Sequence, residues 1–152
     1  MDKLIQAART GNIEQLKELL TNGADINYRD EKGYTPLTIA TYNGQLEATE
    51  LLIKEGANIN AQDNGGNSAL MGVAFKGYPE IAELLMKNGA DLNLKHGNGG
   101  TALMFASMFG SNDIIKLLLA HGADKTIQDS KGFMAVDHAG MQNNMEAVDL
   151  LA

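Results

Sequence analysis

Residues 35–60 read TPLTIATYNGQLEATELLIKEGANIN, and this stretch carries the signals of two short helices joined by a turn. Thr35 is a good N-cap, because its hydroxyl can accept a hydrogen bond from an unpaired N–H of the first helical turn. Pro36 follows at the first helical position, where a missing N–H costs nothing. Apolar residues three and four apart predict one buried face. We expect Gly44 to end the first helix and the second helix to cover residues 46–54.

The same pattern recurs at a constant interval along the whole chain. The turn after the predicted second helix contains Gly-Ala-Asp or Gly-Ala-Asn four times, and one position of the first helix is leucine or valine five times. These positions are Gly23, Gly56, Gly89 and Gly122 in the turn, and Leu4, Leu37, Leu70, Leu103 and Val136 in the helix. Several independent positions that hold one register indicate an internal repeat, which predicts a stacked architecture.

The interval between equivalent positions is 33 residues. This interval and the segment TPLTIA at residues 35–40 resemble the ankyrin repeat, whose period is about 33 residues. The resemblance covers essentially the whole chain. It implies an all-α repeat solenoid in which five stacked helix-turn-helix repeats are joined by β-hairpin-like loops and form a single domain, residues 1–152. The terminal repeats are expected to act as caps, because each has only one neighbour. The predicted repeats are 1–34 (N-terminal cap), 35–67, 68–100, 101–133 and 134–152 (C-terminal cap).

The chain departs from the ankyrin pattern at two kinds of position. The histidine that normally follows the leucine is replaced, so the hydrogen bonds that it makes between neighbouring repeats must be replaced or lost. In the last unit Met134 replaces the capping threonine and Asn143 replaces the glycine that ends the first helix, so we expect this end of the stack to fray first. The residues at the histidine position are Thr38, Met71, Met104 and Asp137.

Composition and charge exclude several classes of function. The net charge is −7, and Arg9 and Arg29 are the only arginines, whereas nucleic-acid binders concentrate Lys and Arg on one face. No apolar run approaches the roughly 20 residues that span a bilayer. We therefore expect neither nucleic-acid binding nor membrane insertion. The first residues lack a signal peptide, which predicts a cytoplasmic protein, with the periplasm as the alternative if a signal has been removed.

The sequence contains no set of residues typical of an enzyme, a metal site or a cofactor site. There is no cysteine, and His96, His121 and His138 stand at three different places of the repeat. Zinc or general-base chemistry would need such residues close together, so we expect each histidine to be structural or exposed. An acidic residue recurs near the start of each second helix, where it stabilises the positive end of the helix dipole, although a cation site is the alternative. These residues are Glu14, Glu47, Glu80, Asp113 and Glu146.

The candidate binding residues lie at positions whose residue type varies from one repeat to the next. These positions are the two that directly precede each helix-ending glycine and the one that directly follows each hairpin glycine, and we expect them to lie off the predicted core. In the ankyrin family these positions line the concave face, and here they carry many aromatic and methionine side chains, which are enriched in protein interfaces. We expect Met71, Met104 and Phe105 to belong to the core instead. The candidates are Tyr34, Tyr42, Asn43, Phe75, Lys76, Met108, Phe109, Phe133 and Met141.

The sequence therefore predicts a non-enzymatic module, monomeric, without cofactor, that binds an unknown protein on its concave face. Two alternatives stay open at this point. One is a self-associating assembly protein whose apolar strip pairs with itself. The other is an accessory to a stress-defence enzyme, because the chain resembles short, free-standing bacterial ankyrin proteins.

Overall fold

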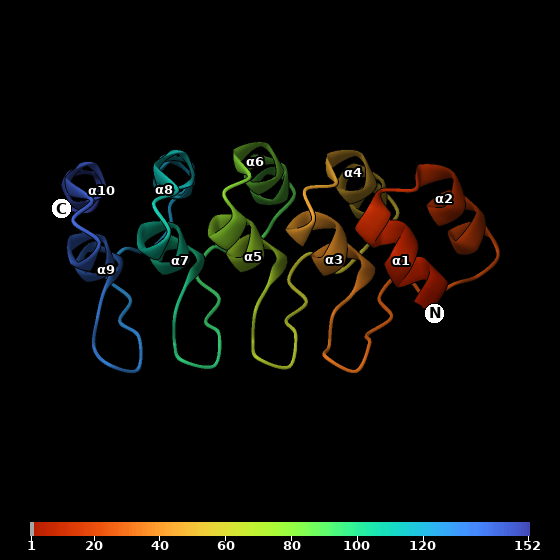
Figure 1. Cartoon of the computed structure of the whole chain (residues 1–152), viewed down its shortest axis with the longest axis horizontal. Helices are drawn as coiled ribbons and strands as arrows, with labels where there is room; N and C mark the ends of the chain where they lie inside the picture. The colour runs from red at the N-terminus through yellow and green to blue at the C-terminus, as the bar shows by residue number, and fades with distance from the viewer. Residues whose placement is uncertain (1) are drawn as a thin grey trace.

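The computed structural model describes residues 2–152, which form ten helices arranged in two rows (Figure 1). The first helices of the five pairs form one row, and the second helices lie above them. Long loops hang below the first row. The first row is α1 (Asp2–Thr10), α3 (Pro36–Tyr42), α5 (Ala69–Lys76), α7 (Ala102–Met108) and α9 (Ala135–Met141). The second row is α2 (Ile13–Thr21), α4 (Leu46–Lys54), α6 (Pro79–Lys87), α8 (Asn112–Ala120) and α10 (Met145–Leu151).

This arrangement confirms the predicted all-α repeat solenoid. Each first helix packs against its own second helix and against the first helices on either side. Within residues 2–152 the loops contain no extended strand, and the hairpin closed by the isolated bridge between Gln62 and Ser68 is the one place where two residues pair as in a sheet. The predicted second helix over residues 46–54 matches the bounds of α4.

The first helices begin at the capping residues that the sequence indicates. The Thr35 hydroxyl accepts a hydrogen bond from the Thr38 N–H at 3.2 Å, and the Thr38 hydroxyl accepts one from the Thr35 N–H at 2.8 Å. In the last unit, the Asp137 carboxylate accepts a hydrogen bond from the Met134 N–H at 2.8 Å. Thr38 and Asp137, two of the four residues at the histidine position, thus form hydrogen bonds within their own unit, and hydrogen bonds between units are made elsewhere.

Hydrogen bonds between successive loops make those contacts. In one series an asparagine side chain accepts a hydrogen bond from a backbone N–H of the next unit at 2.8–2.9 Å; the acceptors are Asn27, Asn60 and Asn93. In a second series a backbone N–H at a hairpin tip donates to a carbonyl of the preceding hairpin at 2.9–3.0 Å. The donor and acceptor pairs are Asn64 and Lys32, Gly97 and Gly65, and Ser130 and Asn98. The hairpins are therefore connected one to the next.

Two turn positions show why particular residues occur there. Gly66 has a φ of +87°, and a Cβ at this position would lie 2.9 Å from the Cα of His96 in the next hairpin, so both conformation and space require glycine. Asn143 has a φ of +56° and is the one non-glycine residue between residues 2 and 152 with positive φ. Asparagine tolerates this conformation better than most residues, so the last first-row helix ends as the others do. That this end of the stack frays first stays a prediction.

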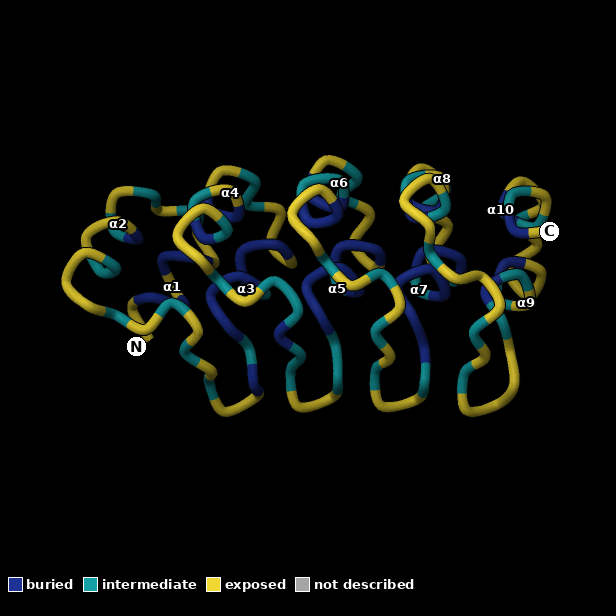
Figure 2. The backbone as a smooth tube through the Cα atoms, turned by 180° about the vertical axis from the view of Figure 1, so that it is seen from behind, coloured by how far each residue is buried: buried dark blue, intermediate teal, exposed yellow. Residues whose placement is uncertain are grey.

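The core lies between the two rows, where Figure 2 shows the buried segments. Leucines of the second helices are almost fully buried there: Leu52, Leu85, Leu118 and Leu151. The buried residues fall into two groups, one over α1–α4 and one over α5–α10. Half-buried Ile53 and Ile59 pack against both groups. These two residues therefore link the two groups of buried residues.

Candidate functional site

A groove with a volume of about 490 Å³ opens between α3 and α5, on the side of the first helices and the hairpins. Its lining is mainly apolar and aromatic, with a few polar groups at the edges. This volume lies within the range of roughly 300–1,000 Å³ that is typical of ligand sites. The lining residues are Arg9, Tyr34, Thr38, Ile39, Tyr42, Asn43, Asp63, Asn67, Ser68, Ala69, Met71, Gly72, Phe75 and Phe105.

Gly72 opens this groove. The equivalent positions of the neighbouring units carry Ile39 and Phe105, whereas Gly72 has no side chain. The ring of Tyr42 approaches from the neighbouring helix α3, and its Cδ1 lies 3.3 Å from the place that a Cβ of residue 72 would occupy. The missing side chain therefore leaves a hollow that is bounded by Tyr42.

Three rings form a continuous row along this face, which we call the aromatic row: Tyr42, Phe75 and Phe109. The centroids of Tyr42 and Phe75 are 6.2 Å apart with an interplanar angle of 11°, and those of Phe75 and Phe109 are 4.5 Å apart at 72°. The residues remain 43%, 41% and 53% exposed. Contiguous exposed apolar patches often mark interaction sites on a protein. The rings thus order one another while leaving their outer faces in water.

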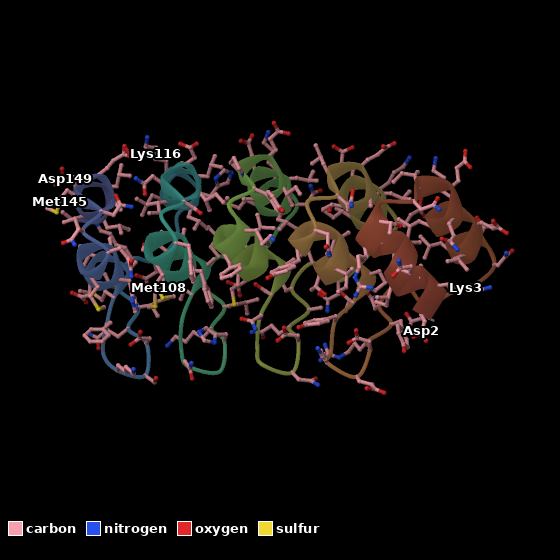
Figure 3. The ribbon with its side chains drawn as sticks, viewed as in Figure 1. Asp2, Lys3, Met108, Lys116, Met145 and Asp149 are labelled. Atoms are coloured by element: carbon pink, nitrogen blue, oxygen red, sulfur yellow. The ribbon has the colours of Figure 1, made fainter. Side chains whose placement is uncertain are left out.

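The nine candidate residues do not form one uniform strip. Four of them line the groove: Tyr34, Tyr42, Asn43 and Phe75. Lys76 and Phe109 adjoin it, because the Lys76 Nζ lies 5.1 Å from the Tyr42 ring centroid and Phe109 contacts Phe75. Tyr34 and Met108 are half-buried, so they offer less surface than expected. Figure 3 labels Met108 on α7.

The remaining candidates, Phe133 and Met141, lie in the last unit and outside the groove. Phe133 is 38% exposed and Met141 is 54% exposed. The Phe133 ring packs edge-on against His138, with the centroids 5.8 Å apart. These two residues therefore lie outside the groove.

Ten of the lining residues were absent from the candidate set, among them Arg9 and Phe105. Arg9 stands one full repeat before Tyr42, in the same register, so the repeat itself was the signal that could have identified it. Phe105 was expected in the core; it packs against the buried core residues but is only half-buried and also lines the groove. Its ring leans on His96, with centroids 4.9 Å apart, and His96 in turn covers Gly100. The Phe105 ring thus contacts both the buried core and the His96 ring.

The groove carries unpaired positive charge. The ion pairs within residues 2–152 are Lys87–Glu83 and His138–Asp129, so neither Arg9 nor Lys76 has a carboxylate within ion-pair distance. The acidic residue of the lining, Asp63, serves its own hairpin, since its Oδ1 accepts hydrogen bonds from the N–H groups of Gly65 and Asn67 at 2.9 Å. The groove therefore differs in charge from the chain as a whole, whose net charge is −7.

His138 and Asp129 form the one close contact between a histidine and a carboxylate in the described part of the chain, with Nε2 and Oδ2 2.8 Å apart. Burial raises the pKa of Asp129, but hydrogen bonds from the Phe133 N–H, the His138 ring and the Lys131 N–H outweigh it and hold this pKa below its usual value. The carboxylate thus organises the last hairpin, which supports a structural role for the pair.

Residues 2–152 contain no group of three or more histidine, cysteine or acidic side chains placed to hold a metal ion. No helix formed by these residues has the length and the apolar character needed to cross a membrane. The groove offers apolar surface, the Arg9 guanidinium, the Asp63 carboxylate and a few amide and hydroxyl groups, and Lys76 adds a second cation beside it. These groups suit recognition by shape, burial and charge.

Comparison with known proteins agrees with this architecture. The family model described as "Ankyrin repeats (3 copies)" matches residues 4–96 and 73–152. A Vapyrin-like protein of Medicago truncatula is 44% identical over 41 residues, which are 27% of this chain and 9% of that protein. Two ankyrin repeat proteins of Rickettsia felis, RF_p14 and RF_pd14, are each 50% identical over 38 residues, or 25% of this chain.

The matched segment is 60% of RF_p14 and 58% of RF_pd14. The chain therefore spans less than two thirds of the length of each of these relatives. The family model, in contrast, matches most of the chain through two overlapping segments. Together with the two rows of helices and the connected hairpins, this match shows that the chain belongs to the ankyrin repeat family.

Proposed function

We propose that this chain is a non-enzymatic module that binds a protein partner in the groove and along the aromatic row. Ankyrin repeats generally mediate protein–protein interaction, and the family is typically non-enzymatic. The observation that carries the proposal is the groove, with three exposed rings that pack on one another beside it. Folding does not require such a surface, because the same positions hold Arg9 and Thr10 in the first unit.

The connections between hairpins favour binding on this side of the molecule. Each hairpin tip donates a backbone hydrogen bond to the one before it, and asparagine side chains connect the adjoining loops. A surface that is already ordered loses little conformational entropy when a partner binds, so more of the contact energy appears as affinity. Typical partners cover roughly 800 Å² on each side, an area that extends beyond the groove over the aromatic row.

Affinity capture from cells of the source organism tests this proposal. The bait proteins are the wild type, a variant in which Tyr42, Phe75 and Phe109 are all alanine, and Met145→Ala. Met145 is 62% exposed on α10, in the other row of helices (Figure 3), so its substitution removes a comparable exposed apolar side chain far from the groove. We expect a protein that is retained by the wild type and by Met145→Ala and is lost with the triple variant. A protein that all three baits retain equally would contradict the proposal.

Self-association is the second candidate function, and the exposed apolar side chains of Phe133 and Met141 in the last unit favour it. A face of this kind can pair with a copy of itself about a twofold axis. Light scattering at two protein concentrations separates the candidates: a constant monomer mass supports the binding module. A mass that rises with concentration, and that returns to the monomer value in a Phe133→Ala/Met141→Ala variant, supports assembly.

A further inference from the structure

We propose that the occupant of the groove is an acidic peptide segment of the partner, in which a carboxylate side chain lies a few residues from a large apolar side chain. This inference rests on the proposed function and adds the chemistry of the segment that is recognised. It is argued from the charge of the groove, from the register of the residues along it, and from its shape.

Charge is the first argument. Arg9 lines one end of the groove and donates a hydrogen bond to Gln6, whereas no carboxylate among residues 2–152 pairs with it. Lys76 lies over the outer face of the Tyr42 ring and is likewise unpaired. A partner that brings a carboxylate gains a charge-assisted interaction at either place, and an amine does not. Together with Asp63 of the lining, these two cations give the groove and its edge a charge of +1, on a chain with a net charge of −7.

Most acidic residues of the chain lie elsewhere, which sharpens the contrast. The first turns of all five second-row helices carry an acidic residue, and these helices form the opposite row of the molecule (Figure 1). Among the three central first-row helices, α3, α5 and α7, the one charged residue is Lys76. An acidic segment therefore meets like charge on the second-row helices, whereas the unpaired cations Arg9 and Lys76 lie at the groove.

The register along the stack gives the spacing within the segment. Arg9 and Tyr42 occupy equivalent positions of neighbouring units, and packed helices are separated by about 8–10 Å. An extended peptide advances about 3.3 Å per residue. A segment that runs across the helices therefore places its carboxylate at Arg9 about three residues away from the side chain that lies beside Tyr42.

The shape of the groove indicates the apolar side chain of the segment. The hollow beside Tyr42 exists because residue 72 is glycine, and buried Ala69 and Met71 also line it. Asn43 stands at the edge, but its amide already donates a hydrogen bond to the Ile39 carbonyl at 2.8 Å. The interior thus offers contact surface and few free polar groups. A phenylalanine, leucine or methionine side chain fits these surroundings.

Selection from a random peptide library against the purified chain tests the inference. The selected peptides are then synthesised and titrated against the wild type, Arg9→Glu, Lys76→Glu and Lys116→Glu. Lys116 is an exposed residue of α8 at the outer edge of the second row (Figure 3), so its reversal changes the net charge equally without touching the groove. We expect selected peptides to combine Asp or Glu with an aromatic or aliphatic residue.

Affinity should fall about tenfold with Arg9→Glu and with Lys76→Glu, and should be unchanged with Lys116→Glu. Raising the salt concentration should weaken binding to the wild type. Exchanging the acidic residues of the peptide for lysine should restore binding to Arg9→Glu. Circular dichroism confirms that each variant is folded, and Arg9→Gln replaces Arg9→Glu if the reversal disturbs α1.

The outcomes separate this inference from the proposed function. Peptides that bind the wild type but not the triple alanine variant, and that carry no excess of acidic residues, overturn the inference and leave the proposed function standing. Peptides that bind the triple variant as tightly as the wild type contradict both. A selection without binders overturns the inference, as does a dimer that forms through the aromatic row, because the occupant is then a second copy of the chain.

Discussion

The contact between Phe75 and Phe109 predicts a measurable coupling of their substitutions. The ring centroids are 4.5 Å apart at an angle of 72°, an edge-to-face geometry that contributes about 0.5–1.5 kcal/mol beyond the burial of area. Because the residues are 41% and 53% exposed, we expect the lower part of this range, about 0.5–1 kcal/mol. Phe75 also stacks on Tyr42, so Phe75→Ala alone should lower the free energy of unfolding by about 1–2 kcal/mol.

Urea denaturation followed by far-ultraviolet circular dichroism measures these effects. With a slope of about 2 kcal/mol per molar urea, Phe75→Ala should lower the midpoint by about 0.5–1 M. A double-mutant cycle over Phe75→Ala and Phe109→Ala should give a coupling energy of about 0.5–1 kcal/mol. The matched control pairs Phe75→Ala with Phe133→Ala, because the Phe133 ring contacts His138 instead.

The control pair should add to within about 0.3 kcal/mol. If the Phe75 and Phe109 substitutions are also additive to this precision, the rings do not rest on each other in solution. The aromatic row would then not be ordered before binding. That result would refute the argument that its surface is available at little entropic cost.

Three further substitutions test the fold. Leu85→Ala removes a fully buried side chain between the rows and should lower the free energy of unfolding by about 2–5 kcal/mol in urea denaturation. A loss below about 0.5 kcal/mol, which is typical of surface positions, would contradict the packing. Gly66→Ala should destabilise more than Gly132→Ala in thermal denaturation, because both have positive φ but only the first meets neighbouring backbone; equal losses would contradict the close approach of the hairpins. Asp129 has a folded-state pKa below its usual value, so its carboxylate stabilises the fold at pH values above the unfolded pKa of about 3.9, and this contribution is lost as the pH falls through the lower folded pKa. Asp129→Asn should therefore lose stability relative to wild type at neutral pH, with the difference shrinking in acid; a difference independent of pH would exclude the linkage.

The helix pairs could be predicted from the sequence because local signals decide them. Thr35 caps the helix that follows it, and α4 has the predicted bounds. The constant repeat period then fixes the order of the units, since each buries its apolar face only against a neighbour. These features depend on residues close in the chain or in strict register, so one sequence was enough.

The shape of the groove depends on contacts across units, which no local pattern describes. Phe105 satisfied the spacing of a core residue, yet its ring packs against His96 of the preceding hairpin and stays half-buried. The space beside Tyr42 results from the absence of a side chain at Gly72, which a search for large candidate residues overlooks. Arg9, in contrast, occupies the same repeat position as Tyr42, so a prediction based on charge as well as apolar character would include it.

The hydrogen-bond partners of the asparagines that connect the loops could not be predicted from local sequence. Asn60 stands at a turn, where asparagine is common because its side chain bonds to nearby backbone. Its Oδ1 instead accepts a hydrogen bond from the N–H of Asp91, 31 residues further along. Both interpretations fit the residue type, and the positions of two different units were needed to decide between them.

The bonds between hairpin tips restrict how this molecule can change in length. Each of the two inner tips is matched to the tips on either side, so an insertion or deletion of a single residue within an inner hairpin shifts its register against two neighbours at once. Adding or removing a complete helix pair with its hairpin keeps every match. Length variants of this stack should therefore differ by whole repeats, and shorter changes should be confined to its ends.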